Sequence, residues 1–406
     1  MATLKPFRGL RPPAALVRSI ASPPYDVVTT QEARAYAAGN EKCFFHVSRP
    51  EIGLPEGADE HSEAVYQLGL KNLRRFEAEG WLRRDPTPRF YVYRQRMGGH
   101  VQSGLVAAAS VDEYDRGLIK KHELTRPDKE DDRARHIEVL GGNDEPVFLT
   151  YRARGEIDSA IAEVAKGAAE YEFTAEDAIE HTFWIVPGSL GERIESLFRE
   201  TPMLYIADGH HRSAAASRVR RRYRDLGRPV GDEERFLAVV FPHDQMQILP
   251  YNRVVTDLGG RTPEAVLETA RSTFEIEQTT IANPPHRHEF GMFLAGNWYR
   301  LKAKRGSFND SPVGALDVTI LQNNLLGPAL GVGDQRTDKR VQFVGGIRGA
   351  GELERLVSSR SFQLAIAMYP TSLEELMAIA DAGQTMPPKT TWFEPKLRSG
   401  LVLHPF

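Results

Sequence analysis

The segment from Tyr205 to Ala216 predicts a buried strand that turns directly into a helix. Its first residues are apolar, Asp208 and Gly209 form a turn pair, and residues 212–224 have helix-forming composition without glycine or proline. The turn delivers two histidines and Arg212 to the helix N-terminus, where unpaired N–H groups and the positive end of the dipole favour an anion. A guanidinium adds a planar fork of donors suited to phosphate or carboxylate. We therefore expect an anion site that carries acid/base groups.

The residues of this turn that we expect to bind phosphate are Gly209, His211, Arg212 and Ser213. Gly209 has no side chain, so a ligand can approach its backbone closely. Asp208, His210 and His211 are the candidate catalytic groups. Two other interpretations stay open, namely a tight turn in which Asp208 only caps the helix, and a metal site formed by the adjacent histidines. Zinc sites on helices usually space their ligands at i and i+4 or use thiolates, and this chain has one cysteine.

A second motif, Lys121-His122-Glu123, precedes a predicted helix over residues 127–140. Thr125 is placed to cap that helix, so the motif lies at the lip of a second helix N-terminus. A carboxylate beside an imidazole suits a general base, and we assign this role to Glu123, with His122 beside it. A solvated charged loop would explain the motif equally well on its own. If the two helix N-termini meet across one cleft, they supply a base, a phosphate anchor and a carboxylate for a metal ion.

The C-terminal segment over residues 387–400 combines lysines, hydroxyls and aromatic rings. Lys389, Thr390 and Lys396 are candidate substrate ligands because they present cations and a hydroxyl beside Trp392. Alternatively, the aromatic residues pin an extended tail into a groove. Arg253 is a further candidate for substrate binding, with a turn or a surface ion pair as the alternative.

Composition excludes several classes of protein. With 406 residues, the chain is long enough for two or three domains. A net charge of −3 gives no general attraction to nucleic acid or to anionic membranes. The single Cys43 excludes an internal disulfide and fits a reducing cytoplasm. The N-terminus lacks an apolar signal region and no stretch approaches about eighteen consecutive apolar residues, so we expect a cytoplasmic protein that does not span a membrane.

Strand and helix patterns are mixed with long loops, which favours an α+β protein over a regular βαβ array. We expect an N-terminal region over residues 1–88, a central domain over 89–245 that carries the Asp208 site, and a C-terminal α+β domain over 246–406. The central domain contains a predicted hairpin around the Gly98-Gly99 turn. Residues 43–47 form a β-like run, and residues 262–274 read as a helix.

The chain resembles a family of bacterial and archaeal proteins defined by a domain of unknown function. The segments that carry this resemblance are Ser22–Val27, His122–Pro127, Asp208–Arg212, Leu249–Arg253 and Met386–Lys389. They are distributed over the whole chain, and their combination is specific to the family. The family itself implies no particular activity.

The stretch Asp-Gly-His-His-Arg-x-x-Ala is also similar to a helix-leading motif of the ParB/sulfiredoxin-like superfamily, in which such a turn holds nucleotide phosphates. Free serine kinases of that superfamily carry a similar turn, which Asp208, Gly209, His210 and Arg212 match, and use an upstream glutamate as the base. The resemblance implies a ParB/sulfiredoxin-like central domain, ATP or ADP with Mg²⁺, and Glu123 as that base. Sulfiredoxin's catalytic cysteine is absent from the motif, which disfavours its chemistry.

The sequence therefore predicts an enzyme that transfers a phosphoryl group to or from a small hydroxylated amino acid such as serine. Arg212 should anchor phosphate, and its removal should weaken ligand binding while leaving folding largely intact. One alternative is a phosphatase or hydrolase that acts on phosphoserine or a similar phosphorylated metabolite. Another is a ParB-like, nucleic-acid-associated nucleotide-binding protein, which the net charge disfavours. A Walker motif and a kinase His-Arg-Asp loop are absent, which excludes the common kinase classes. The oligomeric state is not predicted.

Overall fold

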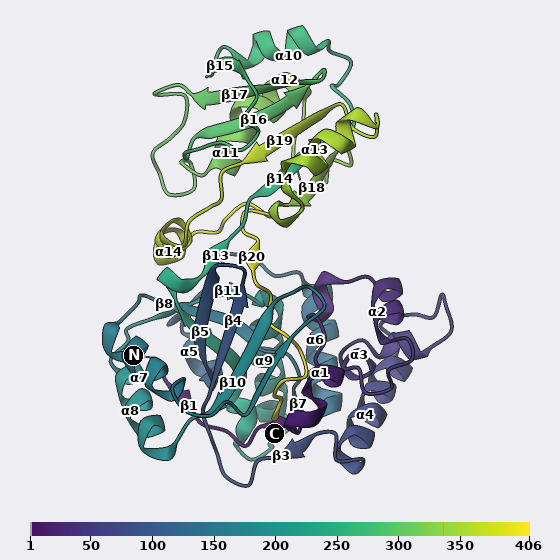
Figure 1. Cartoon of the computed structure of the whole chain (residues 1–406), viewed down its shortest axis with the longest axis vertical. Helices are drawn as coiled ribbons and strands as arrows, with labels where there is room; N and C mark the ends of the chain where they lie inside the picture. The colour runs from purple at the N-terminus through teal and green to yellow at the C-terminus, as the bar shows by residue number, and fades with distance from the viewer. Residues whose placement is uncertain (1, 336) are drawn as a thin grey trace. The chain divides into compact units, whose positions relative to one another are not determined.

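The computed structural model describes residues 2–335 and 337–406 and divides the chain into two compact units (Figure 1). Unit 1 holds the residues up to Met246 together with Pro395–Phe406, and unit 2 is Gln247–Glu394. Both combine helices with sheets, so the predicted α+β class is confirmed. The expected N-terminal region lies in the same unit as the central region, because β1 (Leu4–Lys5) pairs with β5 (His100–Ser110).

The core of unit 1 is a mixed sheet with the strand order β6-β11-β8-β12-β5-β4-β10-β9, with β1 also paired to β5. β6 and β8 run parallel to β11 and β12 respectively, whereas β11 and β8 are antiparallel. The predicted hairpin is confirmed, since Met97 pairs with His100 across the two glycines. The strand bounds are β4 (Tyr91–Met97), β6 (Ile119–Lys120), β8 (Val147–Tyr151), β9 (Tyr171–Thr174), β10 (Glu180–Ile185), β11 (Leu204–Asp208) and β12 (Arg235–Pro242).

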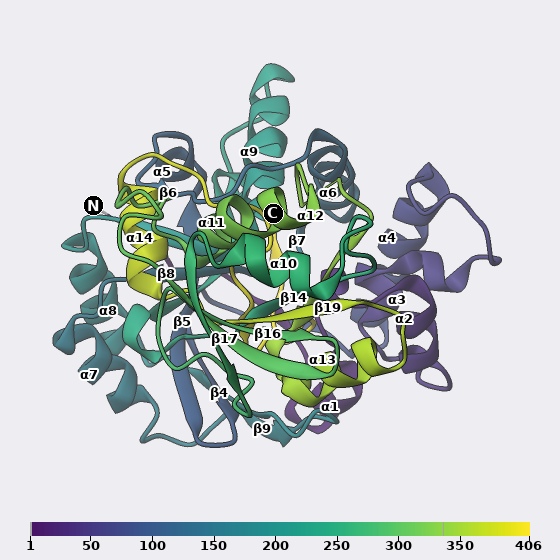
Figure 2. The ribbon, with the colours of Figure 1, turned by 90° about the horizontal axis from the view of Figure 1, so that it is seen from above.

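Helices α7, α8 and α9 pack on one face of this sheet. Alternate strand residues such as Leu105, Leu149 and Ile206 point to that face and share one buried apolar cluster with the three helices. Helix α6 lies beside α9 (Figure 2). It begins with Pro127 and ends at Gly141, which has a φ of 71°, so both predicted limits are confirmed. The helix bounds are α5 (Val111–Asp115), α6 (Pro127–Leu140), α7 (Gly155–Val164), α8 (Gly188–Arg199) and α9 (His210–Asp225).

The N-terminal part of unit 1 is helical. Its helices are α1 (Val17–Ile20), α2 (Thr30–Ala37), α3 (Phe45–Ser48) and α4 (Glu63–Ala78). The β-like run predicted for residues 43–47 is wrong, because this segment forms a turn and helix α3. Phe44, Phe45 and Val47 are all fully buried. A short run that is apolar on every side carries no periodicity, and therefore reads equally well as a strand or as a helix.

Unit 2 contains an antiparallel sheet with the strand order β15-β17-β16-β19-β14-β18. Its first and last segments also pair, with Gln247 opposite Glu394. The helix predicted over residues 262–274 ends early, because Thr273 leads into strand β15 and Phe274 enters the sheet core. The bounds are β13 (Gln247–Ile248), β14 (Tyr251–Val255), α10 (Pro263–Ala270), β15 (Phe274–Thr279), β16 (Glu289–Leu294), β17 (Asn297–Ala303), α11 (Asp317–Leu321), α12 (Gly327–Leu330), β18 (Val341–Gly345), α13 (Gly349–Ser358), β19 (Leu364–Met368), α14 (Leu373–Asp381) and β20 (Phe393–Glu394).

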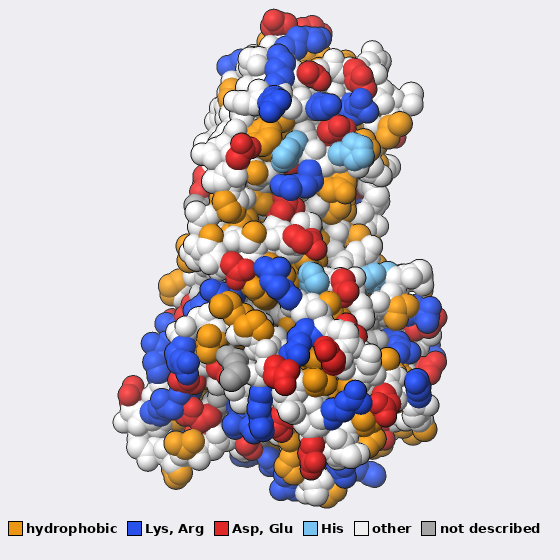
Figure 3. Space-filling model, turned by 90° about the vertical axis from the view of Figure 1, so that its left-hand side faces the viewer, with side chains coloured by type: hydrophobic (Ala, Val, Ile, Leu, Met, Phe, Trp, Pro, Cys, Tyr) orange, Lys and Arg blue, Asp and Glu red, His pale blue; other side chains and the backbone are white. Residues whose placement is uncertain are grey.

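The surface shows no single dominant charge on the face drawn in Figure 3, where lysine and arginine side chains are interspersed with acidic ones. Within the described ranges, no helix has both the length and the apolar character needed to cross a bilayer.

Candidate functional site

The turn between β11 and α9 requires glycine at position 209. Gly209 has a φ of 97°, in the left-handed region, and is the N-cap residue of α9. A Cβ atom there would lie 3.2 Å from Nε of Arg212 and 3.4 Å from Cα of Val147. Asp208 does not cap the helix, since its Oδ1 accepts from the Gly209 N–H at 2.8 Å. The first N–H groups of α9 therefore lack both intrahelical partners and a side-chain cap.

Both histidines of the turn hold the loop that carries the second motif. The backbone N–H of His122 donates to Nε2 of His210 at 3.4 Å, and the N–H of Arg126 donates to Nε2 of His211 at 3.1 Å. Each Nε2 is thus an acceptor, so each neutral ring carries its proton on Nδ1. The two motifs meet, as the sequence suggested for two neighbouring helix N-termini.

His122, Glu123 and His210 form a compact cluster at this junction. The two imidazole rings pack edge to face with their centroids 4.4 Å apart, and Nδ1 of His210 lies 3.8 Å from Oε2 of Glu123. Both histidines are buried, whereas the Glu123 side chain is about half exposed. One ligand atom from each residue lies within 4.8 Å of the others, a spacing that a metal ion could bridge. Imidazole and carboxylate donors together suit a transition metal, whereas Mg²⁺ prefers oxygen donors such as those of Asp208 and Glu123.

Burial keeps both histidines of the cluster neutral at physiological pH. It lowers the pKa of His122 to about 4. It also holds the pKa of His210 well below the usual value, and the neighbouring His122 adds to this effect. Nδ1 of His122 is buried without a hydrogen-bond partner in the described chain. Through this nitrogen the neutral His122 can accept a proton or bind a metal, which are the two kinds of chemistry open to the cluster.

Arg212 is already engaged by protein groups. Its side chain is only 9% exposed; NH1 donates to the Pro146 carbonyl, and NH2 lies 3.2 Å from Asp26 and 3.9 Å from Asp208. Sequence reasoning expected this guanidinium to face a ligand, but two carboxylates compensate its charge. It therefore positions Asp26 and Asp208 at the rim of the site.

Asp208 connects the turn to the C-terminal tail. Nζ of Lys396 lies 2.9 Å from its Oδ2. Burial alone would raise the pKa of Asp208, but Lys396 and Arg212 outweigh that effect and hold the pKa well below its usual range. Lys396 is about one-fifth exposed, so this ammonium can still contact an anion beside the N-terminus of α9.

Ser213 is fully buried and its hydroxyl donates to the backbone carbonyls of Gly209 and His210.

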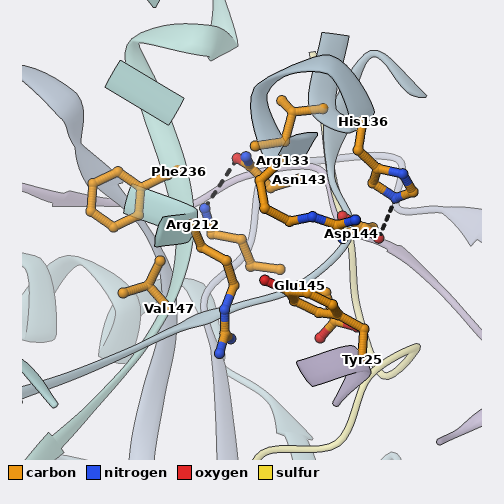
Figure 4. A pocket seen from close by; sticks show the side chains of 11 residues that line it. Tyr25, Arg133, His136, Asn143, Asp144, Glu145, Val147, Arg212 and Phe236 are labelled. Carbon is orange, nitrogen blue, oxygen red and sulfur yellow. Dashed lines mark hydrogen bonds and ion pairs between the residues drawn. The ribbon is translucent and has the colours of Figure 1, made fainter. Parts of the chain in front are cut away.

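A network of buried charges lies beneath Arg212 (Figure 4). It surrounds a cavity of about 10 Å³, room for roughly one water molecule. Asp144 bonds to His136 at 3.0 Å, and the Arg133 guanidinium lies 4.2 Å from the centre of the Tyr25 ring. Sequence reasoning missed all four residues. One sequence feature pointed to this network, namely the acidic pair Asp144-Glu145, which precedes Pro146 at the start of an apolar strand.

Glu145 is the other member of that pair, and it is kept protonated. Burial, and then the neighbouring Asp144, raise its pKa to about 8. The Ser399 hydroxyl lies 2.6 Å from both of its carboxyl oxygens. The C-terminal tail therefore contributes to the network at a second point besides Lys396.

The predicted substrate residues are divided between the two units. Lys396 belongs to unit 1, whereas Lys389, Thr390 and Arg253 belong to unit 2. Arg253 is 1% exposed, and its NH2 donates to the Lys389 carbonyl at 3.0 Å. The alternative of a surface ion pair for Arg253 is wrong, because oxygens of backbone carbonyls and of Gln335 surround the guanidinium. Burial lowers its pKa to about 10.

Comparison with protein families and solved structures assigns the chain to a family. The profile described as "Protein of unknown function (DUF1015)" matches residues 4–319, so the chain belongs to the DUF1015 family. No curated protein sequence matches it.

Solved structures give partial superpositions. A free serine kinase in complex with AMP is 13% identical with a TM-score of 0.34, over 73% of this chain and 92% of that chain. SbnI from Staphylococcus aureus, truncated at its C-terminus, is 13% identical with a TM-score of 0.38, over 72% and 85%. A conserved hypothetical protein from Pyrococcus furiosus is 14% identical with a TM-score of 0.33, over 73% and 95%. Similarity at this level does not define a common fold.

We expect unit 1 to lose stability between pH 7.5 and pH 5. Burial lowers the pKa of His122 to about 4 and those of His181 and His404 to about 3. The unfolded chain therefore takes up these protons first, near pH 6.5, and each histidine costs about 2 kcal/mol at pH 5. The raised pKa of Glu145 acts in the opposite direction, by about 3 kcal/mol over the same interval. A net loss of at least about 3 kcal/mol remains, and His210, whose pKa burial also lowers, adds to it.

Urea unfolding of unit 1 at the two pH values measures this loss. His404→Gln should reduce the loss of unfolding free energy between the two pH values by about 2 kcal/mol, because one histidine no longer contributes. His286→Gln, which alters an exposed side chain of unit 2, should leave it unchanged. Equal unfolding free energies at both pH values in the native chain would contradict the expectation.

Proposed function

We propose that this protein is a phosphotransferase that moves a phosphoryl group between a nucleotide and a small hydroxylated amino acid such as serine. The observation that carries the proposal is the meeting of Glu123 and His210 at the N-terminus of α9. Positioning and charge stabilisation supply most of the catalysis of phosphoryl transfer. Glu123 offers a base for the attacking hydroxyl, and the helix N–H groups offer donors for phosphate oxygens.

The phosphate would bind at the start of α9. The first N–H groups of the helix and Nζ of Lys396 supply donors and positive charge there. His211 and Ser213 would act indirectly, since one holds Arg126 and the other bonds to the turn's carbonyls. Arg212 would keep Asp208 and Asp26 in place. The carboxylate of Asp208 fits the oxygen donors that Mg²⁺ prefers, and the ion would neutralise charge on the phosphates.

Glu123 would take the proton from the serine hydroxyl. The serine oxygen forms a bond to the terminal phosphorus of the nucleotide, the bond from that phosphorus to the bridging oxygen breaks, and the nucleotide leaves one phosphate shorter. The buried His210 lies next to the half-exposed Glu123 and would orient its carboxylate. His122 would line the same corner as a neutral group.

The proposal also covers the domain type, the cellular location and a second group of substrate ligands. The central region would be a ParB/sulfiredoxin-like domain within the boundaries expected from the sequence, residues 89–245, and the protein would act in the cytoplasm. Lys389 and Thr390 would form a separate group of substrate ligands in unit 2, and the buried Arg253 would hold the Lys389 backbone in place.

The test is a product assay. The protein with Mg²⁺, serine and either ATP or ADP should yield phosphoserine, detected by phosphorus NMR. Formation of serine and inorganic phosphate from phosphoserine and water, without nucleotide, would retain the pocket but establish the phosphatase alternative. If neither reaction occurs and duplex DNA binds with a steep salt dependence, the nucleic-acid alternative replaces both.

A further inference from the structure

A second cavity lies in unit 1, between the β4–β5 hairpin and helix α7. Its volume is about 350 Å³, within the range typical of small-molecule sites. Its lining combines three apolar side chains with four polar ones: Val101, Ile161, Ala162, Arg94, Ser103, Asp158 and Gln245. In the sheet, β5 is three strands away from β11, which is about 14 Å. The cavity is therefore separate from the turn at Asp208.

The Arg94 side chain is fixed by contacts that do not involve its terminal nitrogens. Strand alternation puts it on the same sheet face as Val92, toward α7. Its Nε donates to Ser103 Oγ at 3.0 Å, and the guanidinium lies 4.9 Å from the centre of the Trp184 ring. Within the described parts of the chain, NH1 and NH2 of Arg94 make no hydrogen bond and no ion pair. A positioned guanidinium fork of this kind suits a carboxylate.

Asp158 supplies the opposite charge. The Tyr151 hydroxyl donates to its Oδ1 at 2.9 Å, which fixes the carboxylate. No lysine or arginine among the described residues forms an ion pair with Asp158. Burial raises the pKa of this carboxyl, and Asp244 adds to that effect. Of the described residues, the Tyr151 hydroxyl and His243 favour the charged form of Asp158, and a ligand ammonium would add to them.

Arg94 and Asp158 line the same cavity without pairing with each other. Gln245 accepts from the Ser103 N–H through Oε1 at 3.0 Å, which leaves its NH₂ group as a donor beside them. Two unpaired opposite charges in one cavity that also has apolar lining complement a molecule that carries an anionic and a cationic group on a short carbon frame. We propose that this cavity binds a small dipolar ligand of the free amino acid class, its carboxylate on Arg94 and its ammonium on Asp158. This site is additional to the phosphoryl-transfer site.

Calorimetric titration with L-serine, L-glutamine and γ-aminobutyrate tests the proposal. The first two hold the two charges on one carbon atom and differ in side chain, whereas γ-aminobutyrate holds the charges farther apart. At least one should bind, whereas acetate and ethylamine, which carry one charge each, should bind at least about tenfold more weakly. Arg94→Gln and Asp158→Asn should each weaken binding about tenfold or more, as expected for a lost charged hydrogen bond. Both variants keep the bonding capacity toward Ser103 and Tyr151, so the fold should survive; thermal unfolding checks this.

The control variants are Arg193→Gln and Glu163→Gln, whose exposed side chains do not line the cavity. They should bind as the native protein does. Glu123→Gln should also bind L-glutamine and γ-aminobutyrate as the native protein does, since neither carries the hydroxyl that Glu123 would act on. A failure of the phosphotransferase proposal and a failure of this one are therefore distinguishable. The proposal is overturned if none of the three probes binds, if acetate binds as tightly as they do, or if binding survives both cavity substitutions.

Discussion

Replacement of Glu123 by glutamine is expected to lower the rate of serine phosphorylation by about 10²–10⁴-fold, the usual contribution of a positioned general base. The amide has nearly the shape of the carboxylate but cannot accept the hydroxyl proton. Because that proton moves only in the transition state, kcat should fall while nucleotide affinity stays near its native value. The structure makes the substitution mild, since the side chain is 48% exposed and the buried histidines beside it are retained.

Steady-state kinetics and nucleotide titration on the same preparation measure the two quantities. Glu77→Gln is the matched control, because Glu77 is an exposed glutamate on α4. A Glu123→Gln protein with native kcat would remove the base from the mechanism. If nucleotide binding falls in parallel with kcat, Glu123 belongs to the ligand-binding surface instead.

Replacement of Arg212 by alanine should destabilise unit 1 by about 3–5 kcal/mol. The change leaves the carboxylates of Asp26 and Asp208 without their shared cation and the Pro146 carbonyl without its donor. This outcome differs from the sequence-based expectation that the substitution would affect ligand binding alone. Arg212→Lys should recover only part of the loss, because a single ammonium cannot reproduce the fork.

Chemical unfolding followed by a signal from unit 1 gives the free energy. Arg218→Ala serves as the control on the same helix, since Arg218 is one-third exposed and pairs with Glu130 and Asp131 at the surface. Arg218→Ala should lower the free energy of unfolding by no more than about 1 kcal/mol. Equal small effects of the two substitutions would show that the Arg212 cluster contributes little to stability.

The sequence predicted those helices and strands whose ends are marked by residues such as proline and glycine. Helix α6 was located at both ends because Pro127 opens it and Gly141 closes it. Strand β11 is an apolar run that ends in the Asp208-Gly209 turn, and its position was also predicted correctly. Residues 43–47 have neither a period nor a boundary signal, and their structure depends on what surrounds them.

The site was predictable only in outline. The meeting of the His122-Glu123 motif with the Asp208 turn followed from two helix N-termini that both carried acid/base residues. The use of His210 and His211 as acceptors for a loop could not be foreseen, because it depends on backbone N–H groups about 85 residues away. The contacts of Lys396 and Ser399 join residues that are separated by most of unit 2, and no local pattern marks such pairs.

The return of the C-terminal tail to unit 1 has a consequence for biosynthesis. While the ribosome translates residues 247–394, a nascent unit 1 holds Glu145 without the hydroxyl of Ser399 and Asp208 without the ammonium of Lys396. Pairing of Gln247 with Glu394 brings the two ends of unit 2 together. That pairing shortens the effective loop which the tail must close and so lowers its entropic cost. Vectorial synthesis therefore favours an order in which unit 2 folds before unit 1 is complete, so the turn at Asp208 gains its last contacts at the end.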